Sequence, residues 1–292
     1  MKTRKYISLL IVTLILVACG TSRIVPVTGR RQKVYSNNTE ILTSSFSEYK
    51  KFVSTAKLST DATKTAMVKR VGQRLATAVE TYLRNNGYAD EVQNYNWEFN
   101  LVQENQVNAF CMPGGKIVVY EGLLPVTQTE AALAIVLGHE IAHAVAYHSS
   151  EQYQKQANQQ ALGQVAGAVL QGVGMGTNTA STLATLYGLG SQMATLKYSR
   201  DNETEADHIG LIFAAMAGYD PNEAVTFWQR MAASNGGSST PAFLSTHPTD
   251  AQRIAYIQRV LPEALRYYNG TGTTTTSGKA KTPKTTKTIR IK

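Results

Sequence analysis

The sequence has 292 residues, a formal net charge of +9 and two cysteines, Cys19 and Cys111. The excess charge lies at the two ends: three basic residues precede Tyr6 and six follow Asn269, so the part between them is close to neutral. A neutral body offers no basic face to a polyanion, which excludes nucleic-acid binding as a function class. With only Cys111 in the body, an internal disulfide is impossible. The fold must be stabilised by a core, which a chain of this length can form.

Residues 1–18 have the pattern of a bacterial lipoprotein export signal. A basic start is followed by the apolar run Ile7–Val17, too short for a comfortable membrane span, and then by Leu-Val-Ala before Cys19. This predicts a mature chain that begins at Cys19 and is held on a membrane by acyl groups on its sulfur and its amine. Gly20 follows Cys19 where an aspartate could stand, which by resemblance to Gram-negative lipoproteins favours the periplasmic face of the outer membrane. The alternative is an ordinary secretory signal cleaved nearby.

The rest of the chain divides into a lipidated tether over residues 19–32, a globular domain over 33–268 and a basic tail over 269–292. The tail is rich in Thr, Gly and Lys and has almost no large apolar residues, so we expect it to be disordered. Within the domain, the first two predicted helices span Thr39–Ser54 and Asp61–Asn86. The second of these starts with a capping aspartate and ends in Asn-Gly.

Two segments rich in aromatic and β-branched residues, Tyr95–Val102 and Lys116–Tyr120, are predicted to be strands. Between them lies Val107–Gly115, which ends in Pro-Gly-Gly, a sequence typical of a turn. A long helix is predicted next, over Thr129–His148. Strands followed by several long helices predict an α+β fold that is mostly helical, with a small sheet.

The long helix carries His139-Glu140-Ile141-Ala142-His143 inside a stretch that is otherwise nearly all apolar. A helix that is apolar all round belongs in a core, where a carboxylate and two imidazoles are costly unless they are paired or bind a metal. His139 and His143 project from one helix face, so they can share one zinc ion, and Glu140 is near enough to take a proton from its water. The same pattern also arises by chance on surface helices, but these flanks are too apolar for a solvated face.

The later elements are predicted from turn signals and composition. Ala161–Leu196 is rich in Gly, Ala and Gln, and its interruptions favour two small-residue helices joined near Gly174–Asn178 over a transmembrane helix. Asp220–Glu223 predicts the start of another helix, with the aspartate as its N-cap and the glutamate returning to that cap. Ser234–Thr240 is a predicted flexible loop, and Ala251–Val260 is the last predicted helix.

Glu203 and Asp207 lie four residues apart on one face of a further predicted helix, which ends at Gly218. Two histidines plus one glutamate leave a fourth zinc position open for water, as in catalytic sites. Asp207 can then hold one zinc-binding histidine through its free ring nitrogen. In isolation these acids would be an ordinary acidic helix face. Beside the first helix, Glu203 is the predicted third ligand, and Glu205 is the alternative if the helix is rotated by two residues.

These motifs, in this order, resemble the gluzincin metallopeptidases related to the CaaX prenyl protease, the bacterial heat-shock membrane protease and the mitochondrial inner-membrane quality-control metallopeptidase. The resemblance covers roughly residues 25–260 and rests on separated motifs. They are HEIAH at 139–143, E-x-x-x-D at 203–207 preceded by Ser199-Arg200, Asn108-Ala109-Phe110 with Pro113-Gly114-Gly115, and Ser245-Thr246-His247-Pro248 followed by Arg253. It implies a zincin-like domain with one Zn²⁺ per chain and Glu203 as the third ligand.

The resemblance also implies roles for residues outside the two zinc-binding helices. The strand at 108–110 would be a sheet edge beside the zinc, where an extended substrate adds through main-chain hydrogen bonds. His247 would be either a reversible fourth zinc ligand that silences the enzyme or a donor to the transition state. Arg253 would pair with a site carboxylate such as Asp207.

The residues and the resemblance together predict a zinc-dependent endopeptidase in which Glu140 is the catalytic base and Asp207 and His247 assist. The resemblance implies extended or misfolded envelope polypeptides as substrates, a role in outer-membrane protein quality control, and the outer-membrane assembly machinery as a candidate partner. One alternative is a chaperone or assembly factor whose zinc site is normally closed. Another is an inactive binding lipoprotein, which the complete set of zinc-binding and catalytic residues argues against.

Overall fold

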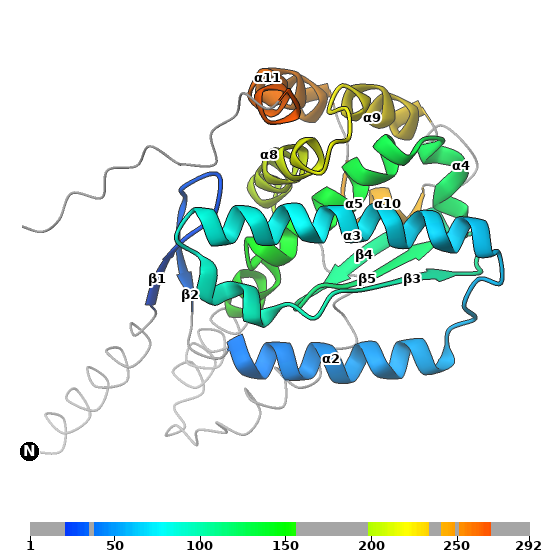
Figure 1. The fold of residues 1–292 in the computed structure, drawn as a ribbon, viewed down its shortest axis with the longest axis horizontal. Coiled ribbons are helices and arrows are strands. Elements are labelled where there is room, and N and C mark those ends of the chain that lie inside the picture. The colour runs from blue at the N-terminus through cyan, green and yellow to red at the C-terminus, as the bar shows by residue number, and fades with distance from the viewer. Residues whose placement is uncertain (1–20, 35–37, 156–197, 234–240, 249–250, 270–292) are drawn as a thin grey trace, which may run out of the picture.

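A small sheet lies between one helix on its first face and a layer of helices on its second (Figure 1). The computed structural model describes residues 21–34, 38–155, 198–233, 241–248 and 251–269. Several predicted segments lie outside the described residues: the export signal with Cys19, the segment 161–196, the loop 234–240 and the tail from residue 270.

The described elements give an α+β fold that is mostly helical, as the sequence predicts. In chain order they are β1 (Thr21–Ile24), β2 (Arg31–Val34), α2 (Asn38–Thr55), α3 (Ala62–Asn85), η1 (Ala89–Asn94), β3 (Glu98–Val102), β4 (Ala109–Met112), β5 (Lys116–Tyr120), η2 (Glu121–Leu123), α4 (Leu124–Thr127), α5 (Glu130–Val145), α8 (Arg200–Met216), α9 (Glu223–Ala233), α10 (Ala242–Thr246) and α11 (Ala251–Tyr268). None of the helices in the described ranges combines the length and the apolar character that a membrane crossing requires.

The three-stranded sheet has the order β3-β5-β4, with β3 parallel to β5 and β4 antiparallel to it. β5 is buried along its whole length, as expected for a central strand, and β4 is an edge strand. The predicted turn between them holds Gly114 and Gly115 at φ of +85° and +81°, a conformation that favours glycine. The strand predicted from Tyr95 begins only at Glu98. Before it, Tyr95 and Trp97 stack on each other, and the N–H of Asn96 donates to the carbonyl of Gly114.

Side chains of β4 alternate between the two layers that sandwich the sheet. Phe110 and Met112 face a cluster with Tyr49 of α2, whereas Ala109 and Cys111 belong to the main core. The main core includes α3 and α5, which lie on the other face of the sheet (Figure 1). The pleat of the edge strand therefore directs Ala109 and Cys111 toward α5, the helix that carries the HEIAH motif.

The start of α3 and the end of α8 follow the signals read from the sequence, and the start of α8 has a cap that was not predicted. At the start of α3, Asp61 Oδ1 accepts a hydrogen bond from the N–H of Lys64 at 3.0 Å. At the start of α8, Ser199 Oγ accepts from the N–H of Asn202 at 3.2 Å, within a capping box. Gly218, at φ +79°, follows the last residues of α8.

α5 and α8 cross so closely that only glycine fits at the contact. A Cβ on Gly138 would lie 2.7 Å from the carbonyl oxygen of Gly210, and a Cβ on Gly210 would lie 2.6 Å from the backbone of Gly138. In a close-packed interior, larger residues here would push the two helices apart. The crossing is one residue before His139, so it brings the predicted zinc ligands of both helices together.

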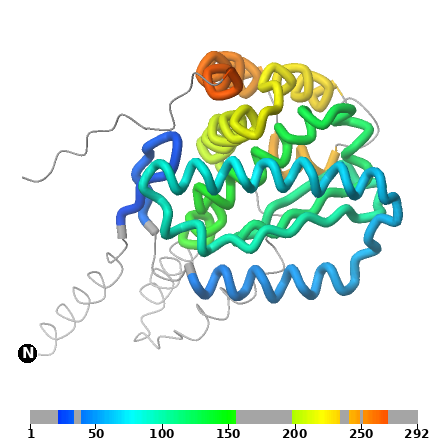
Figure 2. The backbone as a smooth tube through the Cα atoms, viewed as in Figure 1, coloured from blue at the N-terminus to red at the C-terminus, as the bar shows by residue number. Residues whose placement is uncertain are grey.

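The structure corrects the prediction of a tether over residues 19–32. Residues 21–34 form an antiparallel hairpin, β1–β2, that packs against the folded body. Figure 2 shows this hairpin (blue) at one end of the molecule. Val25 is fully buried, and Arg23 forms an ion pair with Glu91 of η1 at 2.5 Å. A lone two-stranded hairpin is marginally stable, so contacts with distant residues form it, and local sequence carries little signal of it.

The helix that carries the HEIAH motif is shorter than predicted. It ends at Val145, and a new helical segment begins at His148. Between them Tyr147 adopts φ +52°, which is unfavourable for a residue with a bulky side chain. The chain changes direction there, so His148 does not continue along the axis of α5.

Two later helices also differ from their predicted limits. α9 begins at Glu223, and Asp220 Oδ1 caps the turn before it by accepting from the N–H of Asn222. Glu223 contacts Thr129 and does not return to the cap. α11 continues past its predicted end, through Pro262, to Tyr268. Its buried face extends to Ala264, and this packing outweighs the hydrogen bond that a proline removes.

Candidate metal centre

Four buried side chains from three helical elements converge at one point. His139 and His143 come from α5, Glu203 from α8 and His247 from the end of α10, and each residue is at most 5% exposed. One donor atom from each lies within 4.8 Å of the others. His139 Nε2 is 3.1 Å from His143 Nε2 and 3.2 Å from His247 Nδ1. Glu203 Oε1 is 3.0 Å from that His247 atom and 3.4 Å from His143 Nε2.

The donors and their spacing fit one zinc ion. Zinc takes nitrogen and carboxylate ligands at about 2.0–2.2 Å in a tetrahedron, whose edges are then about 3.3–3.6 Å. The four donor separations given above, 3.0–3.4 Å, come close to such edges. Glu203 Oε2 and Glu140 Oε1 are buried and accept no hydrogen bond from the described residues. Their nearest polar neighbours are the guanidinium of Arg253, 3.1 Å from Glu203 Oε2, and the ring of His247, 3.4 Å from Glu140 Oε1, so the argument for a metal rests on the spacing of the four donors.

Neighbouring imidazoles prepare the Glu203 carboxylate, and burial prepares the His143 imidazole, for binding a metal. Burial would raise the pKa of Glu203, but the imidazoles of His247 and His139 hold that pKa well below its usual range. Burial keeps the pKa of His143 well below its usual value. Metal ligands must be deprotonated, so an ionised Glu203 and a neutral His143 suit the role.

His247 is fixed by the short helix before it. Its N–H donates to the carbonyl of Phe243 at 2.8 Å, and its ring stacks on that of Phe243 with 4.7 Å between centroids. Arg253 donates to the carbonyls of His247 and Pro248 at 3.3 Å and 3.2 Å. While Nδ1 faces the other donors, His247 Nε2 lies 3.4 Å from Glu140 Oε1. One ring therefore contacts both the donor cluster and the predicted base.

Glu140 lies between the donor cluster and the edge strand. The backbone amide of Cys111 in β4 donates a hydrogen bond to its carboxylate. Burial raises the pKa of Glu140, although His247 and His139 oppose that rise. A carboxylate with a raised pKa is a stronger base near neutral pH, as proton transfer requires.

Asp207 and Arg253 hold the first imidazole in place. Asp207 Oδ1 lies 2.9 Å from His139 Nδ1, and Arg253 donates to the two carboxylate oxygens at 2.7 Å and 2.8 Å. The guanidinium of Arg253 also lies 3.6 Å over the ring of Trp228 and 3.1 Å from Glu203 Oε2. The structure thus places Asp207 against a cluster histidine and Arg253 against Asp207, as expected from the sequence.

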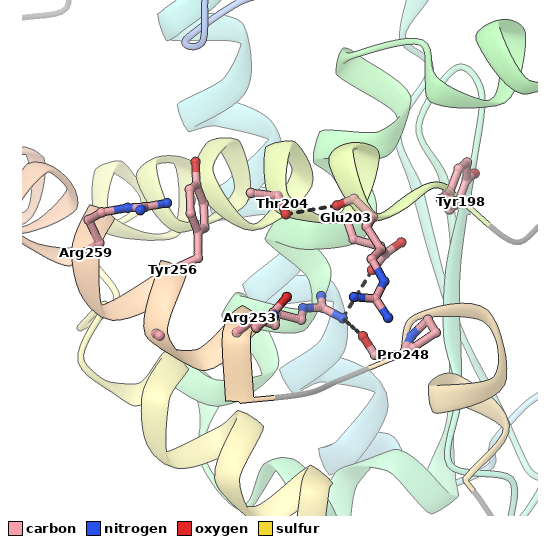
Figure 3. Close-up of a pocket in the computed structure, with 10 residues that line it drawn as sticks. Tyr198, Glu203, Thr204, Pro248, Arg253, Tyr256 and Arg259 are labelled. Atoms are coloured by element: carbon pink, nitrogen blue, oxygen red, sulfur yellow. Dashed lines mark hydrogen bonds and ion pairs between the residues drawn. The ribbon is translucent and has the colours of Figure 1, made fainter.

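A pocket of about 550 Å³ lies beside the cluster. Its inner wall includes Glu203 and Arg253, and Tyr256 and Arg259 of α11 form part of its outer wall (Figure 3). Figure 3 shows Arg253 reaching from α11 toward Glu203 and Pro248. The pocket therefore extends to the carboxylate that completes the donor cluster.

Two aromatic residues beside the cluster were not expected from the sequence. His148 is fully buried, with Nδ1 2.9 Å from His143 Nδ1 and Nε2 2.9 Å from Glu205 Oε2. Glu205, the alternative ligand, therefore belongs to a separate network, and Glu203 is the acid that joins the cluster. Tyr198 stacks on the ring of His143 at 3.9 Å. The one available sequence signal was a third histidine five residues after His143, at the end of an apolar helix.

Asn108, Ala109 and Phe110 lie at the start of the edge strand, but their side chains do not line the cluster. The ring of Phe110 packs edge-on against Phe52 of α2, on the other face of the sheet. Asn108 Oδ1 accepts from the N–H of Ala109 at 3.0 Å. A peptide that adds to this edge would pair with backbone groups of the strand, and Phe110 lies on the face of the sheet that packs against α2.

The sequence profile of peptidase family M48 matches residues 62–261, a range that contains the whole donor cluster. The chain belongs to this family. The mitochondrial metalloendopeptidase OMA1 of Schizosaccharomyces pombe is 40% identical over 169 residues, which are 58% of this chain and 48% of its own length. Human metalloendopeptidase OMA1 is 30% identical over 245 residues, which are 82% of this chain and 46% of its own.

A bacterial relative is also similar to this member of family M48. The beta-barrel assembly-enhancing protease of Yersinia pestis is 30% identical over 162 residues, covering 54% of this chain and 33% of that protein. The chain spans about half the length of the two mitochondrial relatives and about a third of the bacterial one.

Proposed function

We propose that the chain is a zinc-dependent endopeptidase that cleaves extended or misfolded proteins of the bacterial cell envelope. The observation that carries this proposal is the position of Glu140, a buried carboxylate of raised pKa, beside a four-donor cluster that fits one zinc ion. The relatives support it, because they are named as metalloendopeptidases and as a protease that enhances β-barrel assembly.

The direct test is degradation of an unfolded outer-membrane polypeptide by the zinc-loaded chain. We expect cleavage that is lost on chelation and restored by added zinc, while a stably folded globular protein stays intact. Cleavage that persists in the zinc-free protein would contradict the proposal.

Different residues of the chain would bind the metal, transfer the proton and orient a ligand during peptide hydrolysis. His139, His143 and Glu203 would hold the zinc, which when bound polarises the scissile carbonyl and acidifies water. Glu140 would take the proton of the attacking water and later deliver it to the leaving amine. Asp207 would keep the proton on Nδ1 of His139, so that Nε2 faces the cluster.

The edge strand gives a physical reason for preferring extended substrates. β4 has one partner among the described strands, and its Cys111 amide already contacts the carboxylate of Glu140. A peptide that pairs with this edge uses main-chain hydrogen bonds, which do not depend on its sequence. A folded domain cannot present such a strand, so unfolded or misfolded polypeptides fit the site best.

A second candidate function is supported by His247. Its Nδ1 lies as close to Glu203 and His139 as the other donors do, so with His247 bound all four zinc positions would be filled by protein. A site closed in this way suits a chaperone or assembly factor whose proteolysis is secondary. Assembly of outer-membrane proteins that continues unchanged in a proteolytically dead variant would favour this function.

Zinc binding should distinguish Glu203 from Glu205. We expect Glu203→Ala to lower zinc occupancy of the purified chain far more than Glu205→Ala, because only Glu203 joins the donor cluster. Elemental analysis after dialysis against a weak chelator measures both variants. Equal losses would mean that the wrong acid of α8 has been assigned to the metal.

We further propose that the chain is a lipoprotein anchored through acylated Cys19 at the periplasmic face of the outer membrane. The apolar run Ile7–Val17 and the small residues before Cys19 support this location. An anchor there would place the site beside newly exported envelope proteins. The outer-membrane assembly machinery is then a candidate partner.

The anchor has a simple test. In cells fed a labelled fatty acid, we expect Cys19→Ser to remove the lipid label and to leave the precursor unprocessed, since the thiol is the acylated group. Cys111→Ser, which alters the other cysteine, should keep the label. Label that persists in Cys19→Ser would contradict the lipoprotein assignment.

A further inference from the structure

We propose that His148 is a positioning residue for His143, and that Glu205 and the N-terminal hairpin hold His148 in turn. The inference rests on the proposed function, because it takes His143 to be a metal ligand. His139 has such support from Asp207, which belongs to the E-x-x-x-D motif. Nothing in the motifs supplies the equivalent support for His143, and the structure provides it from residues far apart in sequence.

The hydrogen bonds between the two rings fix one arrangement of protons. His143 Nδ1 and His148 Nδ1 are 2.9 Å apart, so one nitrogen carries a proton and the other accepts it. His143 Nε2 faces the donor cluster and needs its lone pair there, so its proton lies on Nδ1 and is donated to His148. His148 then carries its own proton on Nε2, which lies 2.9 Å from the carboxylate of Glu205. Every donor in this series of hydrogen bonds, from His143 through His148 to Glu205, meets an acceptor.

The hairpin completes the network from the connection between its two strands. Thr28 Oγ1 donates to Glu205 Oε1 at 2.5 Å, and Arg30 Nε donates to Glu205 Oε2 at 2.8 Å. Both oxygens of Glu205 are thus occupied, and Arg30 also pairs with Glu151 at 3.1 Å. These contacts link the orientation of the carboxylate toward His148 to the position of the hairpin.

The backbone also shows that the position of His148 is specifically maintained. Tyr147, the residue before it, has φ +52°, and this strained conformation separates His148 from the end of α5. The ring of Tyr147 is held by the guanidinium of Arg23, 4.0 Å from its centroid, again from the hairpin. Hydrogen-bonded partners behind metal ligands fix ring orientation and strengthen binding. These observations together assign His148 to the support of the metal centre.

The test measures metal binding and needs no proteolysis. His148→Leu fills the space but accepts no hydrogen bond, whereas His148→Asn is smaller and keeps an acceptor near the position of Nδ1. By competition with a chromophoric chelator, we expect His148→Leu to bind zinc about 10–100-fold more weakly and His148→Asn to stay within about threefold of wild type. The visible spectrum of the cobalt-substituted protein should change in the leucine variant only. If His148 acted only by filling space, the smaller asparagine would weaken zinc binding more than leucine does.

Separate variants test whether the contacts of the hairpin with Glu205 affect zinc binding. Thr28→Val combined with Arg30→Gln removes the two hydrogen bonds that the hairpin donates to Glu205, and we expect zinc affinity to fall about 3–10-fold. Tyr82→Phe is the matched control, because it removes the hydrogen bond to the N–H of Val27 in the same hairpin and leaves Glu205 untouched. Zinc affinity of the control should equal that of wild type.

The possible outcomes distinguish a failure of the role proposed for His148 from a failure of the proposed peptidase function. Wild-type zinc affinity in His148→Leu, or equal losses in the leucine and asparagine variants, would overturn the role of His148. If the leucine variant does not fold, as judged by circular dichroism of the metal-free protein, wild-type affinity in the hairpin double variant overturns it. A chain that binds zinc as expected but cleaves no polypeptide would overturn only the proposed function. A wild type without zinc affinity would overturn both.

Discussion

Glu140→Gln should lower turnover of an unfolded polypeptide by about 10²–10⁴-fold, or about 3–5 kcal/mol in the activation barrier, while zinc stays bound. Glutamine keeps the shape of the side chain, and its carbonyl oxygen can still accept from the amide of Cys111. It cannot take a proton from the attacking water, so the chemical step alone is lost. Turnover is measured with a fluorogenic unfolded substrate at equal zinc content, determined by elemental analysis.

Glu130→Gln is the matched control for this result. Glu130 lies in the first turn of the same helix and pairs with Arg70, away from the donor cluster. We expect its turnover to equal that of wild type. Wild-type turnover in Glu140→Gln would remove the proposed base from the mechanism. Lost zinc in that variant would instead show that Glu140 acts by holding the centre together.

The elements that the sequence predicts well are those specified by short-range signals. α3 begins at a capping aspartate, and α8 is followed by Gly218. The two histidines of α5 share a face because helical geometry places residues four apart above one another. The four-residue spacing of Glu203 and Asp207 leads in the same way to their shared face on α8. These features depend on neighbours within one turn, so a single sequence is enough to find them.

The features that sequence reasoning missed depend on contacts between distant residues. The hairpin at 21–34 is stabilised by Glu91, Glu151 and Glu205, which lie far along the chain. His148 reaches His143 only because the backbone turns at Tyr147 after α5 ends. Likewise, the close crossing of α5 and α8 requires a glycine on each helix, and neither position has a local signal for it.

His247 is the residue whose role the sequence left most open, and the geometry favours the ligand over the transition-state donor. Its Nδ1 lies 3.0 Å from Glu203 Oε1 and 3.2 Å from His139 Nε2, within the donor cluster. Its Nε2 at the same time lies 3.4 Å from Glu140. In this position the ring would fill the fourth zinc position and also contact the base, so it would block both water and proton transfer.

Removing the ring should therefore activate the enzyme. In the wild type, the ring of His247 must leave the donor cluster before water can bind. If this open form holds about 1–10% of the molecules, His247→Ala raises turnover of an unfolded polypeptide about 10–100-fold, because the variant has only the open form. Zinc should stay bound by His139, His143 and Glu203, which elemental analysis checks. His208→Ala, which removes a histidine of α8 that pairs with Glu263 of α11, should leave turnover unchanged. A fall of about 10²–10³-fold at equal zinc content would instead assign His247 as a donor to the developing oxyanion. Turnover equal to wild type would contradict both roles, because a ring this close to the metal ligands and the base must affect the reaction if it stays there during turnover.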